Sequence, residues 1–209
     1  MSEAFSQVLK AAIALHQFCE ERRWPFCMIG GLVVRRWGEV RVTEDVDITL
    51  LTGWENEERY LETLLGSYRF NGGMTMRQAV EGRVAFLLDP NGVEVDVALG
   101  GTPFEARSIE RSSLWDTGEA ATLRTCSAED LLVHKCFAAR PQDWLDVESV
   151  LDRQQGRLDL AQVRRELQPL AELKDGTDIM VELERLVKKV ARKVDRAQIP
   201  VRQRRGRKD

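Results

Sequence analysis

Hydrophobic residues along the first forty positions mark a helix, a short strand and a second helix. Over residues 4–22 the apolar side chains recur near the 3.6-residue period, which predicts an amphipathic helix. Residues 26–29 form a short apolar run of the kind found in a buried strand. A glycine pair then turns the chain into a second helix over residues 32–37, which Gly38 ends.

The middle of the chain has the two-residue alternation that is typical of strands. Residues 45–50 alternate polar and apolar side chains, and residues 54–66 return to helical spacing. The runs 83–88 and 93–99 are separated by Asp-Pro-Asn-Gly, and an Asn-Gly turn between two alternating runs indicates a β-hairpin. A further pair of short strands is expected between Arg107 and Leu123.

The last third of the chain is predicted to be helical. Ser127 and the acidic residues that follow form a helix cap, and the helix continues from Leu131 to Ala139. Further helices are expected from Pro141 to about Gln154 and over the two ranges 159–173 and 178–196. The chain is therefore predicted to be an α+β protein with a soft boundary near residue 125, inside one compact molecule.

Composition restricts the class of protein. The 209 residues are 43% hydrophobic and 31% charged, and no apolar run approaches the roughly 20 residues that a membrane span needs. The N-terminus lacks the basic start and the cleavage site of a signal peptide. The four cysteines form no CxxC pair and only two histidines are present, so we expect buried free thiols, no zinc site and a cytoplasmic protein.

Charge is distributed unevenly along the chain. The net charge of −3 argues against a protein whose whole surface coats nucleic acid. From Leu183 onward, however, basic residues accumulate, and residues 202–208 alone carry Arg202, Arg204, Arg205, Arg207 and Lys208. This end of the chain either contacts phosphates or is a solvated helix with a frayed basic tail.

Three short motifs carry the candidate chemistry. The first is the glycine pair Gly30-Gly31, because glycines between a strand and a helix let the backbone approach a phosphate at the helix N-terminus. The second is the pair Asp45 and Asp47, whose carboxylates share one face of a strand. The third is Asp96, which joins that pair if its strand lies beside theirs. Clustered carboxylates suit Mg²⁺, which also binds nucleotide phosphates.

In this order and on these elements, the motifs resemble the DNA polymerase β nucleotidyltransferase superfamily. That superfamily has a small-residue turn after a strand, then an acid-hydrophobic-acid strand and a third carboxylate on a later strand. Thirteen residues, 32 to 44, separate the glycine turn from Asp45, which suits the pattern. One departure is Gly31, since many members carry a serine there whose hydroxyl holds a phosphate.

The segment from Arg41 to Asp47 resembles more narrowly the Arg-x-Thr-x-Asp-hydrophobic-Asp motif of AbiEii-like toxin nucleotidyltransferases. The stretches 127–135 and 140–147 are also similar to that family, and the similarity covers roughly residues 24–150. It implies a mixed β-sheet flanked by helices. Residues 1–125 would form the catalytic core, residues 126–198 a helical region that completes the nucleotide site, and residues 199–209 a flexible basic tail.

The resemblance also assigns roles to individual residues. Asp45 and Asp47 would bridge two Mg²⁺ ions, and Asp96 would bind the catalytic one. Lys135 would reach the triphosphate as a point charge, although its helical context alone favours a surface lysine. A nucleotide-binding role is implied for Gly30, Gly31, Arg41, Thr43 and Asp146. The alternative is a purely structural role, which for Asp146 means an exposed carboxylate.

The implied reaction moves a nucleoside monophosphate from a nucleoside triphosphate (NTP) such as ATP to a hydroxyl acceptor. A toxin-like member would modify tRNA or a protein and could have a cognate antitoxin, and the basic C-terminus favours nucleic acid. Two alternatives stay open: an antibiotic-type enzyme with a small-molecule acceptor, and a catalytically silent binding module. The presence of all three aspartates counts against the silent module.

Overall fold

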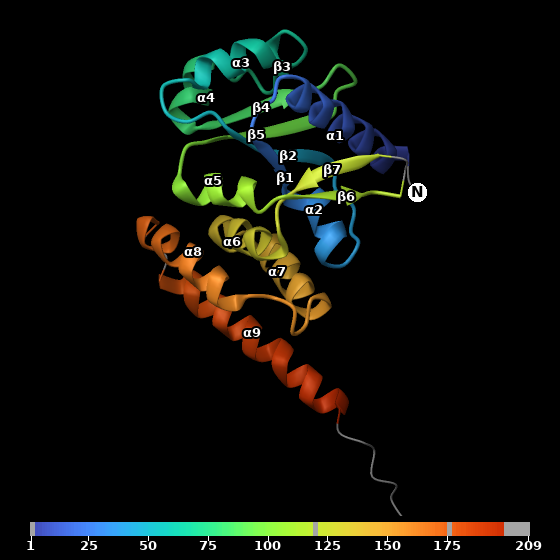
Figure 1. Ribbon diagram of the computed structural model, residues 1–209, viewed down its shortest axis with the longest axis vertical. Coiled ribbons are helices and arrows are strands. Elements are labelled where there is room, and N and C mark those ends of the chain that lie inside the picture. The colour runs from blue at the N-terminus through green and yellow to red at the C-terminus, as the bar shows by residue number, and fades with distance from the viewer. Residues whose placement is uncertain (1–2, 119–120, 175–176, 199–209) are drawn as a thin grey trace, which may run out of the picture.

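A computed structural model describes residues 3–118, 121–174 and 177–198 and contains a seven-stranded mixed sheet (Figure 1). The strand order is β3-β4-β5-β2-β1-β7-β6. The pairs β2–β5 and β1–β7 are parallel, and the other neighbouring pairs are antiparallel. The strands are β1 (Phe26–Ile29), β2 (Asp45–Leu51), β3 (Arg69–Phe70), β4 (Val84–Leu88), β5 (Glu94–Gly100), β6 (Ser113–Asp116) and β7 (Thr122–Thr125).

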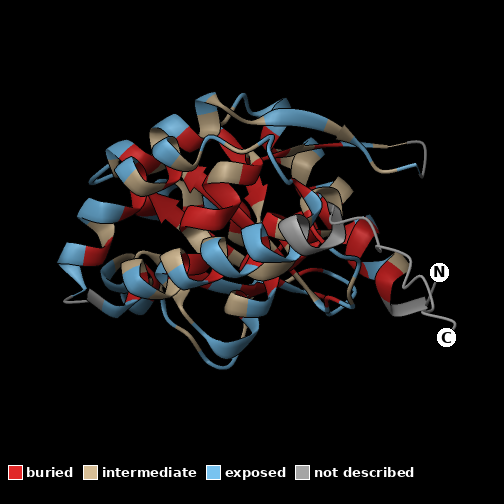
Figure 2. Cartoon of the chain, turned by 90° about the horizontal axis from the view of Figure 1, so that it is seen from below, coloured by how far each residue is buried: buried red, intermediate tan, exposed pale blue. Residues whose placement is uncertain are grey.

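Helices cover the sheet on both sides, with α1, α3 and α4 on one side and α2, α5 and α6 on the other (Figure 1). Buried residues gather between these layers, and the helices turn their exposed faces outward (Figure 2). The helices are α1 (Glu3–Glu21), α2 (Gly30–Trp37), α3 (Glu57–Leu65), α4 (Met76–Gly82), α5 (Pro103–Glu110), α6 (Ala128–Ala138), α7 (Pro141–Arg153), α8 (Leu160–Leu173) and α9 (Thr177–Gln198).

Alternation along the central strands separates an apolar face of the sheet from a face that carries polar side chains. Val46, Ile48 and Leu50 of β2 are buried on one face, and the same holds for Val95 and Val97 of β5. The residues between them therefore point to the opposite face, where the polar side chains of both strands lie. The predicted alternation, the predicted hairpin of β4 and β5 and the predicted mixed sheet are confirmed.

The expected strand pair between Arg107 and Leu123 was wrong at its start. That segment begins with the end of α5, and the two strands are β6 and β7. Thr102 caps α5 in a reciprocal capping box with Glu105, and Pro103 occupies its first turn. These are helix-start signals that outweigh the weak alternation behind them. The same kind of box, between Thr75 and Gln78, starts α4, which the hydrophobic pattern did not predict.

The C-terminal helices are tied to the sheet-bearing part by ion pairs. Arg111, the residue after α5, pairs with the fully buried Asp130 of α6 at 2.6 Å and with Glu166 of α8 at 3.1 Å. Arg107 of α5 also pairs with Glu166. The division of the chain near residue 125 stays a prediction, and residues 199–209 lie outside the described residues.

Two predictions from composition can be compared with the structure. All four cysteines are buried and free, as expected. Within the described ranges, no helix combines the length and the apolar content that crossing a membrane requires.

Candidate functional site

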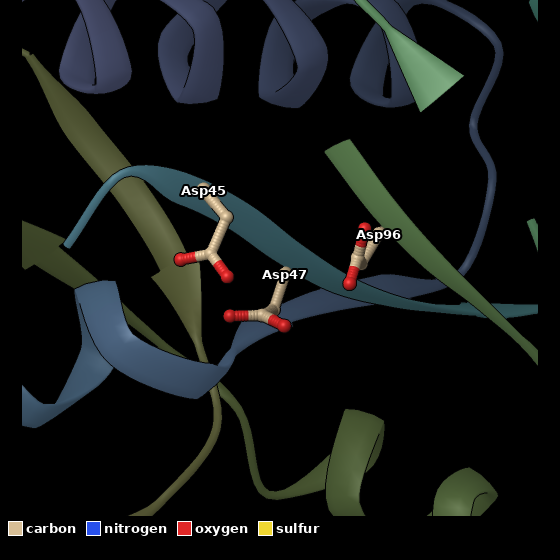
Figure 3. Close-up of side chains that lie close together, drawn as sticks. All are labelled: Asp45, Asp47 and Asp96. Carbon is tan, nitrogen blue, oxygen red and sulfur yellow. The ribbon is translucent and has the colours of Figure 1, made fainter. Parts of the chain in front are cut away.

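Three carboxylates lie together on the polar face of β2 and β5. The parallel register sets Asp47 beside Asp96, and Asp45 is two residues earlier on the same face of β2. One oxygen of each carboxylate lies within 4.8 Å of the others, and Figure 3 shows all three side chains directed to the same space. The structure thus brings together the three aspartates that the sequence analysis singled out as metal ligands.

The environment of these aspartates opposes their negative charge. Burial, followed by the charge of Asp45, raises the pKa of Asp47 from an ordinary 3.8 to about 6. Burial and the charges of Asp47 and Asp45 likewise raise the pKa of Asp96 to about 6. A divalent cation with a preference for oxygen would relieve this repulsion, so the cluster has the donor set and the charge that Mg²⁺ requires.

These raised pKa values predict how the stability of the metal-free protein depends on pH. Between about pH 4 and pH 6 the unfolded chain has lost protons that the folded Asp47 and Asp96 still hold, so the free energy of unfolding falls as pH rises. Urea unfolding in EDTA, compared between wild type and an Asp47→Asn/Asp96→Asn variant, should show this fall in the wild type alone. Parallel curves for the two proteins would contradict the prediction.

The glycine turn Gly30-Gly31 packs closely against the aspartates of β2 and the threonine before them. The Gly31 amide donates to Asp47 Oδ2 at 3.2 Å. Gly30 has a φ of +69°, and a Cβ atom on it would collide with the Asp47 carboxylate. A Cβ atom on Gly31 would collide with the hydroxyl of Thr43, which itself donates to Asp45 Oδ1 at 2.8 Å. Neither glycine can therefore carry a side chain while the carboxylates keep these positions.

Replacing Gly30 by alanine should separate this collision from ordinary backbone strain. We expect Gly30→Ala to displace Asp47 and to lower the nucleotide transfer that the sequence resemblance implies by roughly 10²-fold, the usual effect of a displacement near 1 Å. Gly156→Ala is the matched control, because Gly156 has a φ of +71° and its Cβ would meet nothing within 4 Å. That variant should lose about 1 kcal/mol of stability and keep its activity. Equal activity in the two variants would show that the turn does not position Asp47.

Opposite the aspartates lies a buried group of charged side chains from α6 and α7. Lys135 is only 5% exposed, and its Nζ lies 2.9 Å from both Asp143 Oδ1 and Asp146 Oδ2. Arg41 binds Asp146 through two hydrogen bonds of 2.8 and 2.9 Å, and Arg140 pairs with Asp143 at 2.7 Å. Lys135 and Asp146 are therefore not the surface residues that the simplest alternative described.

Asp143 and Asp146 keep their charge although they are buried. Burial alone would raise both pKa values, but hydrogen bonds from Arg140 and Lys135 hold the pKa of Asp143 below its ordinary value. Hydrogen bonds from Arg41 and Lys135 do the same for Asp146. The two carboxylates thus fix Lys135 in place.

Two members of the aspartate cluster, Asp45 and Asp47, share one cleft of about 670 Å³ with the cations. It has acidic residues on the β2 side and basic residues from the loop before β2, from α6 and from the residue before α7. Residues that line it include Gly31, Arg41, Thr43, Asp45, Asp47, Lys135 and Arg140. This arrangement can hold a chain of phosphates between cations bound to the carboxylates and the fixed positive charges of the protein.

Arg140 and Asp143 are site residues that were not predicted from the sequence. Both stand in the segment 140–147 that carried the resemblance, and the spacing of Asp143 and Asp146 on α7 puts both carboxylates on one helix face. That spacing could have revealed them. Trp24, Trp37 and Trp144 pack against the hydrophobic core.

Comparisons with known proteins concern the family and the fold of the chain. The family model described as "Nucleotidyl transferase AbiEii toxin, Type IV TA system" matches residues 20–205. An antigenic nucleotidyltransferase-like protein from Paracoccidioides brasiliensis has a similar structure, with a TM-score of 0.50, 14% identity and coverage of 86% of this chain and 93% of that one. JHP933 from Helicobacter pylori has a TM-score of 0.46 and 12% identity, with coverage of 94% of this chain and 97% of that one. No curated protein shows significant sequence similarity. The expected fold and the resemblance are confirmed.

Proposed function

This chain belongs to the AbiEii nucleotidyltransferase toxin family, and from that premise we propose that it transfers a nucleoside monophosphate from an NTP to a hydroxyl group of RNA or protein in a Mg²⁺-dependent reaction. The observation that carries the proposal is the cluster of Asp45, Asp47 and Asp96, whose ligand oxygens lie within 4.8 Å of one another. A cluster of this kind at the edge of a cation-lined cleft suits phosphoryl chemistry.

The roles of the residues follow from their positions. Asp45, Asp47 and Asp96 would hold two Mg²⁺ ions, which when bound lower the pKa of the acceptor hydroxyl and neutralise the triphosphate. The acceptor oxygen bonds to the α-phosphorus, the bond from that phosphorus to the pyrophosphate oxygen breaks, and the hydroxyl proton passes to the Asp96 carboxylate. Lys135 and Arg140 bind the phosphates, while Asp146 and Arg41 position Lys135.

Thr43 is the proposed replacement for the hydroxyl that the turn lacks. Its Oγ1 occupies the space into which a side chain at Gly31 would project. A serine at position 31 and a threonine at position 43 would therefore offer a hydroxyl at nearly the same point. We infer that Thr43 turns this hydroxyl toward a phosphate oxygen when nucleotide is bound, and that the Gly30 and Gly31 amides assist it.

The family assignment extends to partners. As a member of a toxin family of type IV toxin–antitoxin systems, the protein is proposed to act on a macromolecule and to have a cognate antitoxin. The requirement for an NTP and the four buried free thiols suit a cytoplasmic location.

Labelling with α-³²P nucleotides tests the proposal. The purified protein is incubated with each of the four labelled NTPs, Mg²⁺ and either total tRNA or cell lysate, beside an Asp45→Ala/Asp47→Ala variant. Label on RNA or on a protein band in the wild type alone is the expected result, and label on a small molecule would point to an antibiotic-type acceptor. If neither protein transfers label and calorimetry finds no Mg²⁺-dependent nucleotide binding, the enzymatic proposal fails.

A further inference from the structure

An aromatic side chain continues the row of catalytic aspartates across the sheet. Asp47 of β2 is the register partner of Asp96 on β5, and Asp96 is the partner of Phe86 on β4. Directly paired residues of neighbouring strands project to the same face, so Phe86 shares the face of the aspartates. The side chains of Ala85 and Leu87 point to the other face and are buried, whereas Phe86 is 40% exposed.

A hollow of about 360 Å³ opens beside Phe86. Among the described residues that line it none carries a charge; they are Asn71, Gly72, Gly73, Met74, Gln78 and Phe86. The Asn71 side chain donates to Glu94 Oε1 at 3.2 Å, and Glu94 lines the nucleotide cleft. The hollow and the cleft are therefore neighbours, joined at this hydrogen bond.

The geometry of in-line displacement indicates which substrate lies over β4 and β5. In an in-line displacement the attacking oxygen and the leaving pyrophosphate lie on opposite sides of the α-phosphorus. The cations proposed to attract the triphosphate are Lys135 of α6 and Arg140, the residue before α7. They lie in the same cleft as Gly31 at the start of α2. Phe86 lies on β4, two strands from β2 on the side of the sheet away from β1. The acceptor must then approach over β5 and β4.

We propose that Phe86 is the stacking platform of the acceptor subsite and that it receives the base of a terminal nucleoside of an RNA strand. The inference rests on the proposed nucleotidyl transfer and specifies its acceptor. Neighbouring strands are about 4.8 Å apart, so one ribose can connect a base stacked on Phe86 to a hydroxyl beside Asp96. Exposed aromatic rings bind unpaired bases in this way in many single-strand-binding proteins.

The chemistry of the hollow favours a base over other acceptors. A polycationic small molecule would require carboxylates there, and the described lining has none. A tyrosine side chain of a protein acceptor offers a ring, but its one hydrogen-bonding group is the hydroxyl that would attack the α-phosphorus. A base offers both a ring and a free hydrogen-bonding edge, and the hollow presents two carboxamides: Gln78 uses its Oε1 in the α4 capping box and Asn71 uses its Nδ2 on Glu94. In the described part of the chain, Gln78 Nε2 and Asn71 Oδ1 make no hydrogen bond and can meet a base edge.

Kinetics with total tRNA, whose single-stranded ends offer terminal nucleosides, test the subsite. Transfer of labelled nucleotide is measured over a range of tRNA concentrations for wild type, Phe86→Ala and Phe86→Tyr. Phe86→Ala should raise the KM for tRNA about 10-fold, a typical loss for one stacked base, and Phe86→Tyr should restore it. Phe137→Ala is the matched control, because Phe137 is 38% exposed and lies on α6 against Lys174; it should behave as wild type.

Calorimetry of Mg²⁺-dependent nucleotide binding, run on the same proteins, tests the acceptor subsite separately from the proposed nucleotidyl transfer. Unchanged nucleotide affinity in Phe86→Ala, with a raised KM for tRNA, supports the subsite. A wild-type KM in Phe86→Ala overturns it. Nucleotide binding with label on protein or on a small molecule but on no RNA also overturns it, and leaves the nucleotidyltransferase intact. Loss of nucleotide binding in the wild type itself would remove both proposals.

Discussion

Replacing Asp47 by asparagine (Asp47→Asn) is expected to lower nucleotide transfer by at least about 10³-fold. The side chain is the middle member of the aspartate cluster and pairs in register with Asp96. Removing its charge weakens the binding of the cations, and their effect on a phosphoryl-transfer transition state amounts to several kcal/mol, at about 1.36 kcal/mol for each factor of ten. Initial rates with labelled NTP, at saturating Mg²⁺, measure the loss.

The same substitution should leave the fold intact or stabilise it. Burial and neighbouring charge already disfavour the ionised form of Asp47, as its raised pKa of about 6 records. In EDTA above that pH, asparagine removes this unfavourable charge, so the unfolding midpoint should stay level or rise. Asp116→Asn, at an exposed carboxylate on β6, is the control and should change neither quantity. A large fall in the midpoint of Asp47→Asn would mean that misfolding, and not lost metal binding, explains the inactivity.

The largest loss of stability is expected for Lys135→Met. The ammonium group lies 2.9 Å from two buried carboxylates, and breaking a buried ion pair from one side usually costs about 3–5 kcal/mol because the partner charge stays behind. Arg140 and Arg41 still pair with Asp143 and Asp146, so we expect about 3 kcal/mol, at the lower end of that range. Urea unfolding gives the value. Lys189→Met, at a half-exposed lysine paired with Glu148, should lose less than about 1 kcal/mol.

A second substitution distinguishes the structural role of Lys135 from its proposed contact with phosphate. Asp143→Asn added to Lys135→Met removes one of the two carboxylates that lost the ammonium group and should recover part of the lost stability. Nucleotide affinity should not recover, since the missing ammonium group cannot attract the triphosphate. Recovery of both quantities together would show that Lys135 only holds Asp143 and Asp146 in place.

Local patterns in the sequence were sufficient to predict the individual strands that position the site. The alternation around Asp45 and Asp47 and the Asn-Gly hairpin before Asp96 correctly predicted β2, β4 and β5. What no local pattern contains is the parallel pairing of β2 with β5, because these strands are separated by more than forty residues. Only the family resemblance implied that Asp96 would join the pair.

The missed features share a different physical origin. Helices α4 and α5 are short, and capping boxes at Thr75 and Thr102 define them more strongly than any apolar periodicity. The burial of Lys135 could not be predicted from α6 alone, since the carboxylates that make it tolerable stand on α7. Phe86 looked like an ordinary strand residue, and only the register across three strands sets it beside Asp96.

The Thr43 hydroxyl lies where a Cβ atom on Gly31 would project, and this has an evolutionary consequence. A serine cannot enter position 31 while Thr43 keeps its place, because the two side chains would claim the same space. A lineage that exchanges one hydroxyl source for the other must pass through an intermediate with both or with neither, and each is impaired. The two positions are thus expected to change together, so descendants would retain one of two alternative pairs rather than a free mixture of residues.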